Sequence, residues 1–169
     1  MVALSIALMA CSALSLSLHS ALQQTDAGLE AAIAQGLTEQ LMDEVLGMRY
    51  DPPANPLGSG REYYDDIGDF DGLSTTPPAD PYGVALGRDD GAGGERHPRF
   101  TPPTGLLDDW QQEVEVYYVE EDDPQTRMSA NQSSALRAIE VRIYDVANGR
   151  KRLLAELRRV IGSLPESVP

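Results

Sequence analysis

The hydrophobic pattern of the first 47 residues predicts one long helix with two different halves. Residues 1–22 are mostly Ala, Leu, Ser, Ile, Val and Met and contain no Asp, Glu, Lys or Arg. From Gln23 onward, apolar residues recur mainly at every fourth position with polar residues between them, which is typical of an amphipathic helix. Gly47 is expected to end this helix, and Pro52 and Pro53 prevent it from restarting.

The two halves predict two environments. Residues 1–24 are long enough to cross a bilayer, because a hydrocarbon core of ~30 Å needs about 20 helical residues. We expect this half to lie in a membrane or in the shared core of a filament, and residues 25–47 to pack on a globular head. The residues expected to serve the membrane or assembly are Leu4, Ile6, Leu8, Leu14, Leu16 and Leu18. The residues expected to contact the head are Leu29, Ile33, Leu37, Leu41 and Val45.

Residues 48–109 are rich in Pro, Gly and Asp. This composition excludes a long helix and predicts an extended, variable loop region. The loop is not a purely polar tract, because apolar side chains punctuate it at Tyr63, Tyr64, Ile67, Phe70, Leu73 and Tyr82.

Residues 110–169 predict an antiparallel sheet. Apolar and polar residues alternate in QQEVEVYYV (111–119) and again over 136–146, the pattern of a sheet with one covered face and one wet face. Asn148-Gly149 predicts a hairpin turn into RKRLLAELRRVIG. That last segment also has helical spacing, but the turn directly after a strand favours a strand. The whole pattern predicts an α+β fold, with a long N-terminal helix packed on a small antiparallel sheet of about three or four strands.

The hairpin allows two registers. A two-residue loop pairs residue 147 with 150 and places Val141 opposite Glu156. A three-residue loop, 148–150, places Val141 opposite Leu157 and Ile143 opposite Ala155. The second register keeps apolar residues opposite apolar residues, so it is favoured.

Net charge and cysteine content restrict the classes of function that the chain can have. The chain carries 13 Lys and Arg against 27 Asp and Glu, a formal net charge of −14. A nucleic-acid role is therefore not expected, because phosphate binding needs clustered positive charge. The single cysteine, Cys11, lies in the apolar half of the helix, so the head forms no disulfide of its own. Leu8-Met9-Ala10-Cys11 resembles a bacterial lipoprotein cleavage box, and the alternative is a small apolar residue that faces lipid or a neighbouring helix.

One cluster of side chains suggests a ligand. Asp65, Asp66, Asp69 and Asp71 lie close together in sequence, and oxygen ligands of this kind suit calcium. The spacing of a twelve-residue calcium loop is not met, because residues 73–78 are LSTTPP. The favoured alternative is that these Asp side chains cap turns through backbone N–H groups, while neighbouring apolar residues pack under the sheet.

The remaining chemistry is sparse. His97 and His19 are isolated, no serine lies in a G-x-S-x-G setting, and no glycine-rich loop follows a strand. No enzyme and no cofactor are therefore predicted. Five basic residues form a patch in the last strand and its turn: Arg150, Lys151, Arg152, Arg158 and Arg159. This patch either docks an acidic surface of a neighbouring subunit or deters aggregation at a sheet edge.

Together these features resemble the type IV pilins and type II secretion pseudopilins. The middle of the chain, REYYDDIGDFDGLS (61–74) followed by Thr76-Pro77-Pro78, resembles the Asp-Asp-aromatic-Gly segment of the MshD-type minor pilins of the mannose-sensitive haemagglutinin pilus. Members of the family begin with a short basic leader and a Gly-Phe-Thr-Leu-x-Glu run, which this chain does not contain, although Val2 to Leu8 resembles the segment that follows that run. We expect Met1 to be an internal methionine with the start of the protein upstream, which the genomic DNA would show.

The resemblance implies a non-enzymatic minor pilin or pseudopilin that assembles through its N-terminal helix into a type IV pilus or a type II secretion pseudopilus. The implied partners are other pilin-like subunits and the inner-membrane assembly platform. The implied location is the bacterial inner membrane, as a single-pass protein with a periplasmic head, or a cell-surface filament. One alternative is a membrane-anchored periplasmic binding module, with or without calcium, and another is a lipoprotein anchored at Cys11.

Overall fold

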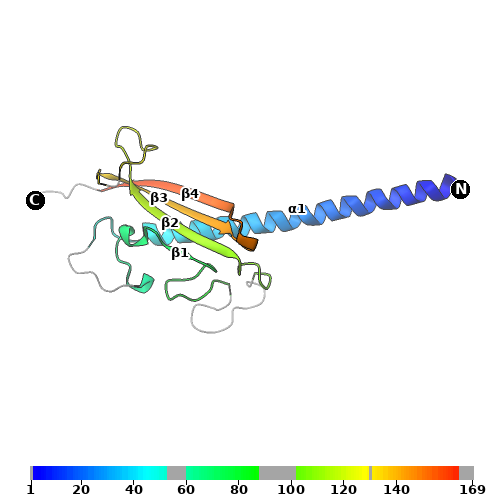
Figure 1. The fold of residues 1–169 in the computed structure, drawn as a ribbon, viewed down its shortest axis with the longest axis horizontal. Helices are drawn as coiled ribbons and strands as arrows, with labels where there is room; N and C mark the ends of the chain where they lie inside the picture. Colours follow the sequence, from blue (N-terminus) through cyan, green and yellow to red (C-terminus); the bar gives the residue numbers. More distant parts are fainter. Residues whose placement is uncertain (1, 53–59, 88–101, 130, 164–169) are drawn as a thin grey trace, which may run out of the picture.

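The computed structural model describes residues 2–52, 60–87, 102–129 and 131–163, with side chains described in the helix from Leu14 onward and not for Asn148. A single helix, α1 (Val2–Leu46), extends from a head built on a four-stranded antiparallel sheet (Figure 1). The strands are β1 (Ser74–Thr75), β2 (Trp110–Tyr118), β3 (Leu136–Asp145) and β4 (Arg152–Gly162). Short 3-10 turns are η1 (Arg61–Tyr63), η2 (Ile67–Phe70) and η4 (Ala147–Gly149). The predicted α+β class, the long helix and the small antiparallel sheet are confirmed.

The helix ends where the sequence predicts. Its last residue is Leu46, and the N–H of Gly47 donates to the carbonyl of Asp43 at 3.0 Å and to that of Glu44 at 3.2 Å. These bonds satisfy carbonyl groups that the end of a helix leaves open.

The sheet has the order β1-β2-β3-β4, and every neighbouring pair is antiparallel. Buried and partly exposed residues alternate along most of β2, with Trp110, Val114 and Val116 buried between Gln111, Glu113 and Glu115. The two-residue strand β1 comes from the Pro- and Gly-rich region, where the sequence predicts only loops. Ser74 pairs with Glu113 and Thr75 with Gln112, so β1 exists because β2 offers it an edge.

The β3–β4 hairpin contains both registers that the sequence allows. Val141 pairs with Leu157 and Ile143 with Ala155, which confirms the favoured register in the body of the hairpin. Nearer the turn, Tyr144 pairs with Leu153 and Asp145 with Arg152, which is the register of the two-residue loop. The shift falls between Ile143 and Tyr144. One extra residue in β4 therefore reconciles a tight turn with an apolar core face.

The main core lies between α1 and the inner face of the sheet. It contains Leu41, Met42, Val45, Ile67, Phe70, Val114, Val116, Ile139 and Val141. A second cluster, Ala34, Leu107, Trp110 and Ile143, continues it toward the N-terminal part of α1. Burial of this apolar surface against α1 is what joins the helix to the head.

The head covers less of α1 than the sequence pattern indicates. Leu41 and Val45 are buried and Ile33 and Leu37 are partly buried, but Leu29 is exposed. The reason is geometric: each i+4 step turns about 40° around a helix, so a residue twelve positions earlier lies about 120° away from the buried direction. The covered face instead runs through Ala34, Thr38, Leu41, Met42 and Val45.

Candidate functional site

The most conspicuous surface is the part of α1 that extends beyond the head. We call residues 14–32 the arm. Its large apolar side chains are exposed to solvent: Leu14 is 70% exposed, Leu16 71%, Leu18 65% and Leu22 57%. Large exposed apolar surface of this kind is typical of a site for interaction. The predicted assembly residues Leu14, Leu16 and Leu18 therefore lie on open surface.

Three other predicted assembly residues, Leu4, Ile6 and Leu8, fall where no side chain is described, and so does Cys11. Among the described residues, no helix combines the length and the apolar character needed to cross a membrane.

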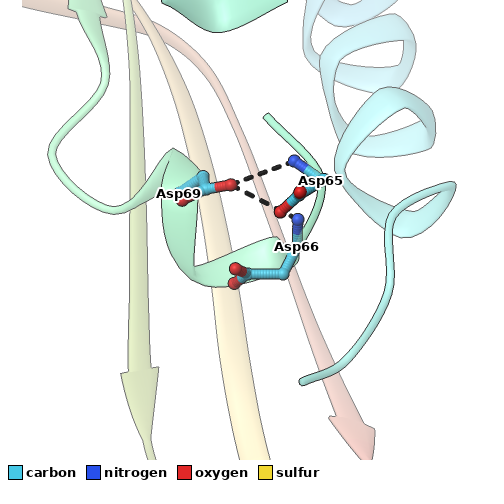
Figure 2. A group of neighbouring side chains, drawn as sticks. All are labelled: Asp65, Asp66 and Asp69. Carbon is cyan, nitrogen blue, oxygen red and sulfur yellow. Dashed lines mark hydrogen bonds between the residues drawn. The ribbon is translucent and has the colours of Figure 1, made fainter. Parts of the chain in front are cut away.

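The turn around η2 gathers three of the four predicted Asp residues. One ligand oxygen each from Asp65, Asp66 and Asp69 lies within 4.8 Å of the others. Figure 2 shows the Asp69 carboxylate directed at the backbone of the other two, and Asp69 Oδ2 accepts from Asp65 N at 3.0 Å and Asp66 N at 3.4 Å. Asp66 Oδ1 in turn accepts from Gly68 N at 2.6 Å, which completes a capping box at η2.

These bonds are the ones expected of Asp side chains that cap a turn. Ile67 and Phe70, which η2 presents to the core, are buried, and Tyr64 meets Phe70 edge to face with ring centroids 4.9 Å apart. Asp71 is not part of the group, because its Oδ1 accepts from Val116 N of β2 at 3.0 Å. A calcium ion at this turn stays a prediction. Such an ion would compete with the backbone N–H groups for the carboxylates of Asp66 and Asp69.

The wet face of the sheet carries a charge network centred on Arg142 of β3. Its Nη1 donates to Glu115 Oε2 at 3.0 Å, its Nη2 lies 2.6 Å from Glu140 Oε2, and its Nε donates to Glu156 Oε1 at 2.7 Å. Burial opposes the charge on Arg142, but the bonds to these carboxylates outweigh it and raise the pKa of the guanidinium. The same bonds lower the pKa values of Glu115 and Glu156. The cluster is thus a structural cross-strand network, which the alternation of charges in the strands would reveal once the register is known.

Two arginines missed by the sequence analysis tie the loops to the rest of the head. Arg61 forms a two-pronged pair with Glu44 of α1, at 2.9 and 2.6 Å, and also donates to the carbonyl of Ala79. Arg137 lies between the rings of Tyr50 and Tyr118, 4.7 and 4.8 Å from their centroids. No local pattern points to either, since each depends on residues far apart in the chain.

The basic patch lies along β4 and its turn. Lys151 pairs with Glu113, and Arg152 pairs with Glu30 and Asp145. Arg158 donates to Tyr117 Oη at 3.1 Å and to the carbonyl of Pro124. Arg150 and Arg159 are exposed, and no ion pair joins either to another described residue.

Comparisons with known proteins do not extend this description. No family model matches the chain, and neither the curated proteins nor the solved structures contain a match. The architecture itself, a long N-terminal helix packed against a four-stranded antiparallel sheet, is pilin-like.

Proposed function

We propose that this chain is a non-enzymatic, pilin-like subunit, of the minor pilin or pseudopilin kind, that assembles through its N-terminal helix into a type IV pilus or a type II secretion pseudopilus. Before assembly it is held in the bacterial inner membrane with its head on the periplasmic side. Its partners are other pilin-like subunits and the assembly platform of that membrane.

The observation that carries this proposal is the arm of α1. Its leucines are exposed over a stretch that the head does not cover, and the sequence before it contains no Asp, Glu, Lys or Arg. An apolar helix exposed to water is unfavourable in a domain that stays alone, because moving each such side chain out of water lowers the free energy. Helices with small residues such as Ala and Ser among the leucines pack closely against one another, as a shared filament core requires.

The apolar contacts between the head and α1 lie outside the arm. They are concentrated in the helix from Ile33 to Val45. At the boundary, Arg152 Nη2 at the start of β4 meets Glu30 Oε1 at 2.6 Å.

The test is recovery of the epitope-tagged full chain in filaments sheared from the surface of the bacterium that encodes it. We expect the chain in the filament fraction as well as in the membrane fraction. Leu16→Asp should remove it from the filaments, because a charge would enter the shared apolar core. Gln24→Asp, which adds the same charge to the same helix at an already polar position, is the matched control.

Two results would contradict the proposal. Recovery in the membrane fraction alone, with no effect of Leu16→Asp on any assembly, would favour a membrane-anchored binding module. Labelling by palmitate that Cys11→Ser abolishes would favour a lipoprotein.

A further inference from the structure

The last strand, β4, forms an open edge of the sheet. The N–H of Ser163 donates to the carbonyl of Ala135 at 3.0 Å, and this bond continues the series of pairs Ile161 with Arg137 and Arg159 with Ile139. In an antiparallel ladder the bonding residues alternate with residues whose N–H and C=O point the other way. The main-chain groups of Glu156, Arg158 and Val160 therefore point away from β3, and within the described residues nothing pairs with them.

This open edge is basic in an acidic chain. Residues 150–159 contain five basic side chains and one acidic one, Glu156. Arg150 and Arg159 are exposed without an ion-pair partner in the described parts of the chain. Together, unpaired main-chain groups and unpaired cations make an edge suited to an acidic partner.

The opposite edge of the same sheet has the opposite charge. The sheet ends there at β1, and residues 61–71 lie next to it, because Asp71 Oδ1 accepts from Val116 N of β2. These residues contain five acidic side chains and a single basic one, Arg61. Arg61 is already neutralised by Glu44. The carboxylate of Asp65 accepts no hydrogen bond from the described residues, and Glu62 is exposed. We call residues 61–71 the acidic edge.

The direction of α1 limits how copies of the chain can use these edges. The helix runs parallel to β4, because Glu30 meets the first residue of β4 while Leu41 and Met42 pack in the cluster that Leu157 and Ile161 join (Figure 1). Two β4 strands paired across a two-fold axis would run antiparallel, and their arms would point in opposite directions. A filament whose arms lie side by side excludes that contact, so a neighbour that meets β4 in such a filament does so through a different surface.

We propose that β4 of one copy docks against the acidic edge of the next copy in the same orientation. This inference rests on the proposed function, because it takes the arms to be parallel. Such a head-to-tail contact adds copies without limit, as a filament requires, unless the rotation between neighbours closes a ring. Its strength depends on salt, since exposed charges are screened over about 8 Å at physiological ionic strength.

The experiment uses the purified full chain in detergent, with Cys11→Ser removing the native thiol and Asp65→Cys with Arg159→Cys adding one thiol to each edge. Neither replaced side chain has a bonding partner among the described residues, so the fold should be kept. On mild oxidation we expect a ladder of covalent dimers, trimers and longer chains, because each copy links to two neighbours. The ladder should shorten at 500 mM NaCl, an ionic strength several times physiological, where screening is stronger.

Three controls make the outcome decisive. Each single-cysteine variant alone should give monomer, and an equal mixture of the two should give dimer only. Asp122→Cys with Arg159→Cys, which moves the thiol to an exposed acidic residue between β2 and β3, should give no ladder. Arg159→Glu should lower the mass of the assemblies in light scattering, and adding Asp65→Lys should restore it.

Other results would overturn the inference. A dimer from Arg159→Cys alone would show a symmetric β4 contact, and no cross-link in any variant would show that the two edges do not meet. Absence of any cross-link, with the chain still present in sheared filaments, would leave the proposed function standing. A symmetric dimer would count against the inference and also against the parallel arms on which it rests. Absence from filaments with a clear ladder would instead reject the function and keep the contact.

Discussion

The two parts of α1 both contain leucines, but the leucines differ in their exposure to solvent. On the arm, Leu16 and Leu18 are exposed, whereas Leu41, twenty-three residues after Leu18, is almost wholly buried. Both parts are helical and continuous. The difference lies in what covers them, because only the second part faces the sheet, η2 and the side chains of Ile67 and Phe70.

This contrast shows that an apolar side chain indicates a surface suited to burial, but does not identify the surface that packs against it. The head supplies its own cover for α1 from Ile33 onward. The apolar side chains of the arm have none within the described chain, and under the proposed function lipid or another helix covers them. The following predictions test that division, beginning with the largest expected effect.

The division predicts unequal costs for the same substitution. Leu41→Ala should lower the free energy of unfolding by about 2–5 kcal/mol, because it opens a cavity in the main core. Leu16→Ala should change it by less than about 0.5 kcal/mol, since that side chain is exposed. Urea unfolding of the two variants in detergent measures both. Equal losses would show that the arm also packs on the head.

A second prediction concerns the wet face of the sheet, which has no helix over it. Arg142→Met should cost about 1–3 kcal/mol at pH 7, because it leaves Glu115, Glu140 and Glu156 together without their shared donor. The lowered pKa values of Glu115 and Glu156 mean that their bonds to Arg142 stabilise the fold above the unfolded pKa. That contribution is lost as the pH falls through the lowered values.

The pH dependence of Arg142→Met supplies the control. Below about pH 4.5 the stability of the wild type should fall toward that of the variant, because the carboxylates become protonated in both. Unfolding curves at pH 7 and at pH 3 would show this convergence. A difference that stays constant with pH would mean that Arg142 acts through packing alone.

A third prediction tests the turn that fixes Phe70 under the helix. Asp66→Ala should cost about 1 kcal/mol, the usual worth of an N-terminal cap, because Gly68 N loses its acceptor. Asp66→Asn retains an acceptor oxygen and should cost much less. Thermal unfolding followed by circular dichroism compares the two. Equal losses would show that the charge of Asp66, rather than its cap, stabilises the turn.

The smallest effect is expected at the boundary between the two parts of α1. Glu30→Gln removes the ion pair with Arg152, whose side chain is 57% exposed, and should cost less than about 1 kcal/mol. The loss should vanish in high salt because the pair is screened. Hydrogen exchange at the amides of residues 26–34 would detect a change in where the helix leaves the head. Unchanged exchange would place that boundary under the control of apolar packing alone.

Local pattern was enough to predict much of this fold. Gly47 directly follows the last residue of α1, and the alternation around Val114 and Val141 places two strands with the correct inner face. Each of these depends on residues within one or two turns or pleats of one another, so periodicity reveals them. The apolar pairing of Val141 with Leu157 also followed from local composition.

Long-range packing decided the rest. The exposure of Leu29, the shift between Ile143 and Tyr144, and the pairing of β1 with β2 each depend on a surface that another part of the chain provides. The grouping of three glutamates around Arg142 likewise requires three strands in register. The sequence by itself determined the long helix, the three long strands and the apolar positions along them. Only the tertiary structure decided which of those apolar positions the head covers. The reason is that burial requires two surfaces in contact, whereas a sequence pattern describes only one of them.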